Sequence, residues 1–296
     1  MEKKKWKFSG HETFVFRHGW LEKGYRFVKA GKSFGDENAI VDLGVGKNMV
    51  ESIRYWCEAT TITVEGKTSP FADALLDSGG WDPFLEDDAS LWLIHWKMIN
   101  NQNLFTSGSA IFSLLHRPEF TKRDVTDAVM RRLADDMKKL PSQHIILRDV
   151  ECYLRLYVGT KRLGKTKAAN DESFDCPLQN LGMINLMNDA DMYRFAIGPK
   201  PTLPPEIVGY AIWDYCRSAK RSSIRIQEAL YHAGSPGQVF MLDENSLVEA
   251  IYRLNSDQLW GEQFSFSESA GIALIECSLS DGDELLSSYY NKGRQQ

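Results

Sequence analysis

Apolar residues recur at helical spacing directly after a pair of glycines near residue 45. Five of them fall on one face of a helix over residues 47–57, namely Met49, Val50, Ile53, Trp56 and Cys57. Gly44 and Gly46 permit a tight turn before that helix, including a left-handed backbone. A helix over residues 37–43, with Asp36 as its N-cap, leads into the turn. The pattern predicts a helix-turn-helix.

A strand and a wing are expected directly after this motif. Residues 61–64 read Thr-Ile-Thr-Val, which alternates and is rich in β-branched side chains, and Gly66 then turns the chain. An earlier amphipathic stretch predicts a first helix over residues 20–30. Together these pieces predict a winged helix over residues 18–80.

Helices predominate in the next part of the chain. Residues 91–99 are apolar almost all round, which predicts a buried helix that starts near Ala89 with Asp88 as its cap. Thr121 begins a long helix, and Ser142 begins another. The expected inner face of the long helix consists of Val125, Val129, Leu133, Met137 and Leu140.

The last part of the chain mixes helices and strands. Asp243 is the expected cap of its last helix. Helices are predicted over residues 176–184, 206–217, 224–231 and 244–254, and strands over 192–197, 239–242, 263–266 and 271–276. The polar, basic stretch 160–173 has no periodicity and is the expected linker.

The predicted fold class is mainly α with small β-wings. It comprises an N-terminal winged helix-turn-helix, a helical middle and a C-terminal winged-helix-like domain. The corresponding regions are residues 1–80, 81–160 and 174–296. A length of 296 residues suits more than one domain.

Composition excludes several classes of protein. Hydrophobic residues make up 43% and charged residues 25%, which is ordinary for a globular chain. The five cysteines form no Cys-x-x-Cys pair, which argues against a zinc site and a disulfide framework. No signal peptide or membrane span is recognisable, so a cytoplasmic location is expected. Net charge is −5, yet residues 1–32 hold nine Lys/Arg against three Glu, and the tail from 243 is acidic.

The polar face of the 47–57 helix carries residue types that read DNA. Phosphates and base edges are the expected partners of Lys47, Asn48, Ser52, Arg54 and Tyr55. Further contacts to double-stranded DNA are expected from Arg17, Arg131 and Arg132. The alternative is an amphipathic helix whose polar face is only solvated. A P-loop is rejected because Val41 and Asn48 occupy positions that need Gly and Ser or Thr.

Carboxylates gather between residues 82 and 88. Asp82, Glu86 and Asp87 could hold Mg²⁺ or Mn²⁺ for phosphodiester cleavage, and His11 or Glu12 could then transfer a proton. The alternative is that these acids cap a helix and that His11 and Glu12 form a structural pair. A second carboxylate pair, Asp149 and Glu151, faces different ways on a helix, so the two are expected to be surface groups or salt-bridge partners.

Several long sequence words resemble one bacterial family. They are FSGHETF (8–14), LGVGKNMV (43–50), SIRYWC (52–57), DPFLED (82–87), LWLIHW (91–96), DCPL (175–178) and SPGQVF (235–240). The chain resembles a family of unknown-function domains encoded beside DNA phosphorothioation genes, together with the SspB-like proteins of the single-strand phosphorothioation system. The resemblance covers almost the whole chain.

This resemblance implies a protein that acts on DNA. SspB-like proteins are associated with nicking one strand so that sulfur can enter the backbone, alongside a cysteine desulfurase and an ATP-dependent sulfurtransferase. One hypothesis is therefore a metal-dependent nicking endonuclease of a bacterial defence system. Another is a non-catalytic DNA-binding adaptor that recruits the sulfur-transfer enzymes, and a third is a protein-interaction scaffold. Base rates for DNA-binding proteins favour a homodimer.

Overall fold

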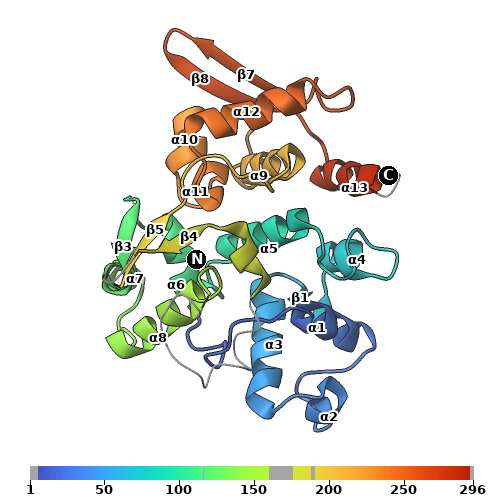
Figure 1. The fold of residues 1–296 in the computed structure, drawn as a ribbon, viewed down its shortest axis with the longest axis vertical. Helices are drawn as coiled ribbons and strands as arrows, with labels where there is room; N and C mark the ends of the chain where they lie inside the picture. The colour runs from blue at the N-terminus through green and yellow to red at the C-terminus, as the bar shows by residue number, and fades with distance from the viewer. Residues whose placement is uncertain (1–5, 116, 160–175, 188–190, 294–296) are drawn as a thin grey trace. The chain divides into compact units, whose positions relative to one another are not determined.

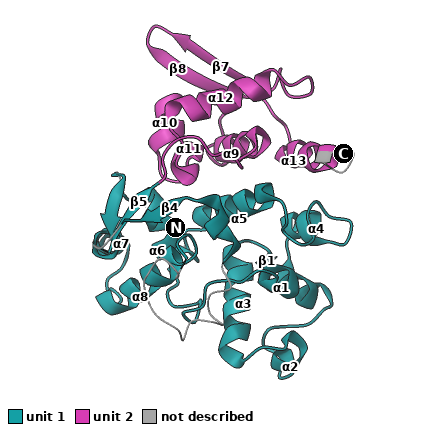
Figure 2. Cartoon of the chain, viewed as in Figure 1, with its two compact units in different colours: residues 1–195 teal, residues 196–296 magenta. Residues whose placement is uncertain are grey.

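The structure is a computed structural model that describes residues 6–115, 117–159, 176–187 and 191–293 (Figure 1). These residues are mostly helical, with small antiparallel sheets, which confirms the coarse fold class expected from the sequence. The chain forms two compact units, residues 1–195 and 196–296 (Figure 2). Among the described residues, no helix is both long and apolar enough to cross a membrane.

The first part of unit 1 contains the two helices and the glycine turn predicted around residue 45. Its elements are α1 (Trp20–Lys29), α2 (Ala39–Leu43), α3 (Lys47–Ala59), β1 (Thr63–Val64), β2 (Lys67–Thr68) and α4 (Pro70–Leu76). Gly44 ends α2 in the left-handed region with φ 62°, as the turn requires. The strands β1 and β2 pair as a minimal antiparallel hairpin directly after α3.

The rest of unit 1 adds a helical layer and a three-stranded sheet. Its elements are α5 (Asp88–Asn100), α6 (Thr106–Ser113), β3 (Glu119–Thr121), α7 (Lys122–Asp136), α8 (Gln143–Leu154), the 3-10 helix η2 (Pro177–Leu181), β4 (Ile184–Leu186) and β5 (Met192–Phe195). The strand order is β3-β5-β4, so the last strand in sequence lies in the middle. The predicted buried helix is confirmed, because Trp92, His95 and Trp96 on α5 are at most 1% exposed.

Unit 2 repeats a similar order of elements. It contains α9 (Pro205–Ser218), β6 (Ser223–Arg225), α10 (Ile226–Tyr231), α11 (Pro236–Phe240), α12 (Glu244–Asn255), β7 (Phe264–Ser269), β8 (Ile272–Cys277) and α13 (Gly282–Gly293). The strand order is β6-β8-β7, and α9 packs against both α12 and α13. Asp243 caps α12 by accepting the N–H of Ser246, as predicted.

Several predicted element ends are wrong. Asp36 does not cap α2, because its carboxylate accepts the N–H of Ser33 and the helix begins at Ala39. The cap of α5 is Asp87, which accepts the N–H of Ala89, and Asp88 is already helical. The inner face of α7 ends with Leu133 because the helix stops at Asp136. Met137 and Leu140 therefore lie beyond the helix.

Two predictions in the last part of the chain also need correction. Residues 239–242 do not form a strand, because a proline at the first helical position starts α11 at Pro236. The predicted helix over 176–184 is the shorter η2, which ends as expected at a left-handed Gly182. Ile184 belongs instead to β4.

The two units differ from the three regions expected from the sequence. The expected linker, residues 160–173, lies outside the described residues. The strands β4 and β5 follow that stretch, yet β5 pairs with β3, which precedes it. The sheet therefore joins the expected middle region to residues 184–195.

The contact between α1 and α3 supplies a test of this packing. A Cβ added at Gly24 would lie 2.3 Å from Cys57 Sγ and 3.1 Å from Ile53 Cγ2. We expect Gly24→Ala to lower the free energy of unfolding by about 1–3 kcal/mol, because the extra methyl group overpacks the interface. Chemical denaturation measures this loss.

The control for this substitution is Gly79→Ala, since a Cβ there meets nothing within 4 Å. Adding Cys57→Ala to the Gly24→Ala variant removes the clashing sulfur and should restore part of the lost stability. A Gly24→Ala protein as stable as the Gly79→Ala protein would contradict the observed α1–α3 contact.

Candidate functional site

The N-terminal end of α3 presents two of the predicted DNA-contacting residues to solvent. Lys47 and Asn48 are both exposed in the first turn of the helix. Arg54 lies further along and is half-exposed, at 41% of its side chain. Its guanidinium lies 3.3 Å from Glu51 and 3.7 Å from Glu58, so acids of the same helix already partner it.

The side chains of Ser52 and Tyr55 face the interior instead. Ser52 is fully buried and its hydroxyl donates to the carbonyl of His11 at 3.1 Å. Tyr55 is 1% exposed and donates to the carbonyl of Leu104 at 2.8 Å. The Tyr153 hydroxyl lies 2.6 Å from that of Tyr55, and burial raises the pKa of both groups well above the usual tyrosine value. Neither Ser52 nor Tyr55 is available at the surface of α3.

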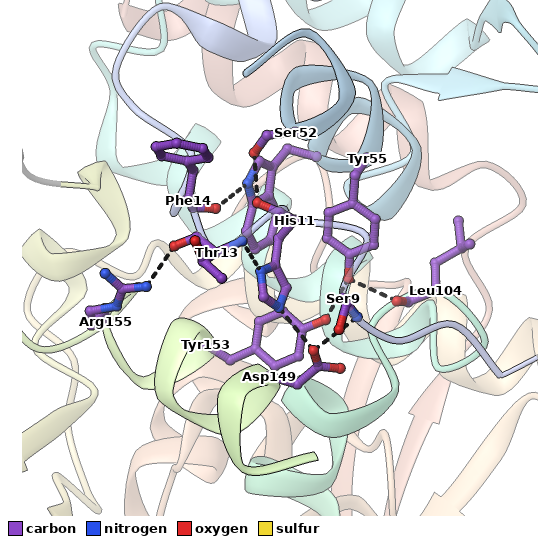
Figure 3. A network of polar contacts seen from close by, with 11 residues as sticks. Ser9, His11, Thr13, Phe14, Ser52, Tyr55, Leu104, Asp149, Tyr153 and Arg155 are labelled. Atoms are coloured by element: carbon purple, nitrogen blue, oxygen red, sulfur yellow. Dashed lines mark hydrogen bonds and ion pairs between the residues drawn. The ribbon is translucent and has the colours of Figure 1, made fainter. Parts of the chain in front are cut away.

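His11 is the centre of a buried polar network, drawn in Figure 3. The ring is 1% exposed, and its Nε2 lies 3.1 Å from Oδ1 of Asp149, which is fully buried on α8. The N–H of Thr13 donates to Nδ1 at 2.9 Å, so Nε2 carries the proton that faces Asp149. The N–H of Ser9 donates to the same Oδ1 at 2.9 Å. His11 therefore pairs with Asp149 rather than with Glu12, which is exposed.

The pKa of His11 reflects two opposing effects. Burial lowers it, while hydrogen bonds to Asp149 and Cys152 raise it by more, to about 9. The N–H of Thr13 opposes the cationic form because it donates to Nδ1, which carries no proton in the neutral ring. Protonation of His11 is thus linked to the local geometry of residues 11–13.

The loop around His11 is held in an uncommon backbone conformation. Ser9, Glu12 and Thr13 all have positive φ, at 58°, 47° and 68°. Its carbonyls are used by neighbouring elements, since Trp56 Nε1 donates to Phe14 at 3.0 Å and Arg155 donates to Thr13 at 2.6 Å. We call residues 9–14 the anchored loop. Buried as it is, His11 fixes this loop and does not face a substrate.

The predicted metal ligands are placed by local hydrogen bonds. Asp82 is 8% exposed and accepts the N–H groups of Glu86 and Asp87 and the hydroxyl of Ser90, at 3.0, 2.9 and 2.6 Å. Asp87 caps α5 through Ala89 at 2.8 Å. These bonds occupy both oxygens of Asp82 and order the turn into α5.

These carboxylates do not fit a preformed divalent-cation site. A Mg²⁺ ion needs several oxygen ligands aimed at one point, whereas both oxygens of Asp82 already accept hydrogen bonds from the turn and Glu86 is exposed. No group of three or more His, Cys, Asp or Glu side chains in the described part of the chain is arranged to hold a metal ion.

The three arginines predicted to contact the DNA backbone lie outside α3, one just before α1 and two on α7. Arg17 stacks on the Trp20 ring at 5.6 Å. Arg131 is exposed on α7. Arg132 pairs with Asp136 at 3.0 Å and lies 5.6 Å from the Trp6 ring.

A cleft of about 560 Å³, which the sequence did not predict, lies beside the anchored loop. We call it the α8 cleft. Its polar lining consists of Thr13, Lys122, Arg148, Glu151, Arg155 and Tyr193. Lys122 reaches Glu151 and Asp191 at 3.2 Å each. Burial alone would lower the pKa of Lys122, but the hydrogen bonds to these acids raise it.

The His11–Asp149 pair predicts a pH dependence of stability. A folded-state pKa of about 9 for His11, above the ordinary histidine value of 6.5, means that the pair stabilises the fold fully below pH 6.5. This contribution should be lost as the pH rises through about 9. Thermal unfolding from pH 6 to 10 should therefore show a steeper fall in Tm for the wild type than for His11→Gln.

The matched control is His144→Gln, because His144 is exposed on the same helix as Asp149. Its profile should follow the wild type. Parallel profiles for wild type and His11→Gln would mean that His11 stays neutral throughout.

Comparison with known proteins identifies the family. The family described as "Protein of unknown function (DUF4007)" matches residues 8–290, while the curated proteins contain no match. Two crystal structures of SspB are similar over 98% of this chain and 89% of theirs, both at 28% sequence identity. The magnesium ion-bound SspB structure gives a TM-score of 0.86 and the other 0.84. These similarities confirm the resemblance read from the sequence, and the chain belongs to the DUF4007 family.

Proposed function

We propose that the protein is the DNA-binding component of a bacterial DNA phosphorothioation system. The observation that carries this proposal is the similarity to SspB over almost the whole length of both chains, at 28% identity and a TM-score of 0.86. Through that resemblance, its expected partners are a cysteine desulfurase and an ATP-dependent sulfurtransferase. Its role is to present DNA to these enzymes.

The order of elements supports DNA binding. In a winged helix, a helix and a strand precede two helices, and a two-stranded hairpin follows. Unit 1 has this order in α6, β3, α7, α8, β4 and β5, and unit 2 has it in α9, β6, α10, α12, β7 and β8 with α11 inserted. In both sheets the third strand lies between the first and the second, as in winged helices. The helix-turn-helix of α2 and α3 with its small hairpin is a third, simpler module.

The DNA contacts proposed for α3 are those of its exposed first turn. Lys47 suits a phosphate or a guanine edge, and Asn48 suits an adenine edge in the major groove. Arg17, Arg131 and Arg132 would add contacts that depend on charge and not on sequence. Ser52 and Tyr55 are left out because their hydroxyls are engaged inside the unit.

A second candidate function is metal-dependent nicking of one DNA strand. The observation that favours it is that SspB has been crystallised with a bound magnesium ion. A metal ion supplies charge stabilisation and an activated water for phosphodiester hydrolysis. In this chain, Asp82, Glu86 and Asp87 serve the turn into α5, so nicking would need ligands that come together only when DNA binds.

The α3 contacts predict the behaviour of a double variant. Lys47→Ala with Asn48→Ala should reduce discrimination between DNA sequences by about 1–3 kcal/mol for the lost base contact. The slope of log affinity against log salt should fall by about 1, because one cation is removed. Fluorescence anisotropy with labelled duplexes at several salt concentrations measures both quantities.

Stability should not change, since both side chains are exposed. Arg217→Ala, an exposed cation on α9, is the matched control. If the double variant and this control bind every duplex equally well, α3 is not the recognition helix.

Intrinsic nicking is tested by relaxation of supercoiled plasmid. The purified chain is incubated with Mg²⁺ or Mn²⁺, and in parallel with EDTA. Open-circular product that EDTA abolishes would establish a metal-dependent nickase. For the adaptor we expect intact plasmid that still shifts on a gel, and a chain that neither shifts nor nicks DNA would contradict both functions.

A further inference from the structure

The charges of the α8 cleft are unevenly paired. Lys122 is neutralised by Glu151 and Asp191, each at 3.2 Å. Arg148 is exposed, and within the described ranges it forms no ion pair or hydrogen bond through its side chain. Arg155 likewise has no carboxylate partner there, and one of its N–H groups donates to the Thr13 carbonyl. Among the described residues, two guanidinium groups of this cleft therefore form no ion pair, and its carboxylate, Glu151, is engaged by Lys122.

A hydrogen bond to the anchored loop orients the Arg155 side chain. Its acceptor, the Thr13 carbonyl, belongs to the anchored loop, and Thr13 has φ 68°. The N–H of the same residue donates to His11, which is fixed by the buried Asp149. A backbone conformation of this kind persists only where its surroundings over-determine it. The anchored loop thus positions Arg155, which keeps four further N–H donors for a ligand.

The rest of the cleft lining is less polar, which suits a ligand with a charged group next to a less polar part. Leu154, Val158 and the buried Tyr193 complete the lining next to the cationic groups. A volume of about 560 Å³ lies within the usual range of ligand sites. A planar guanidinium presents paired donors that match the oxygens of a phosphate group.

We propose that the α8 cleft binds a phosphate group of the nucleic-acid backbone through Arg148 and Arg155. Arg148 lies on α8, the third helix of its winged-helix order, which is the helix that enters the DNA groove in such modules. Lys122 and Glu151 form the fixed ion pair at the edge of the site. This inference deepens the proposed function and rests on it, because it assigns a backbone-binding site to a second module.

The test compares Arg148→Ala and Arg148→Lys with Arg123→Ala. Arg123 is 86% exposed on the neighbouring α7 and does not line the cleft, so its loss is the matched control. Three probes are titrated: inorganic phosphate and a thymidine dinucleotide by ³¹P NMR, and a 20-base-pair duplex (about two helical turns) by anisotropy. Arg148→Ala should weaken dinucleotide and duplex binding about tenfold, as expected for loss of a charge-assisted hydrogen bond.

Arg148→Lys should fall between wild type and Arg148→Ala, because lysine keeps the charge and loses the paired donors. Equal weakening of inorganic phosphate would support the site with a free or terminal phosphate as its ligand. Weakening of the dinucleotide and duplex alone would identify the phosphodiester. If Arg148→Ala matches Arg123→Ala with every probe, the proposed site is overturned.

The probes also separate this inference from the proposed function. Wild-type protein that binds duplex while Arg148→Ala and Arg123→Ala bind it equally would overturn the cleft and leave the DNA-binding function standing. If the small phosphates bind in a manner that depends on Arg148 but the duplex does not bind, the cleft site would stand and the DNA-binding function would be overturned. Wild-type protein that binds none of the three probes would overturn both.

Discussion

The buried contact between His11 and Asp149 is the interaction on which unit 1 depends. A carboxylate taken out of water is costly unless it is paired and hydrogen-bonded, and here Oδ1 of Asp149 faces the imidazole and accepts the N–H of Ser9. Among the described residues, the buried Oδ2 has no hydrogen-bond partner. The contact spans 138 positions of sequence and fixes the anchored loop between α3 and α8. Contacts with both α3 and α8 hold the anchored loop and keep three of its residues at positive φ. In that conformation its carbonyls can orient Trp56 and Arg155.

The two three-stranded sheets share one order of strands but present different charges. On α8 the exposed face carries Arg148 and Glu151, and Lys122 pairs with Glu151, whereas the exposed face of α12 carries Glu244 and Glu249 with Arg253. A phosphate backbone is attracted to the first surface and repelled by most of the second. Two modules with the same strand order can thus differ in what they bind through a few exposed side chains.

Periodicity predicted the elements whose core-facing residues recur regularly, such as α1, α3 and the buried α5. It missed contributions that depend on distant partners. Asp149 was predicted to be a surface group or a salt-bridge partner. It does pair with His11, but it is buried, as Ile146 and Tyr153, three and four positions away on the same face, indicate. Ser52 and Tyr55 look polar in sequence, but their partners are the carbonyls of residues 11 and 104. No local pattern reveals the Thr13–Arg155 contact, which joins residues 142 positions apart.

The place of β5 has a consequence for the integrity of the chain. Its register with β3 joins Phe120 to Tyr193, and its register with β4 joins Ile184 to Phe195, so the sheet closes across residues 160–175. A protease that cut the backbone in that interval would leave both fragments bound through the sheet and its buried aromatic rings. The same interval is a natural split point, at which two separately made halves could reconstitute unit 1 by strand pairing.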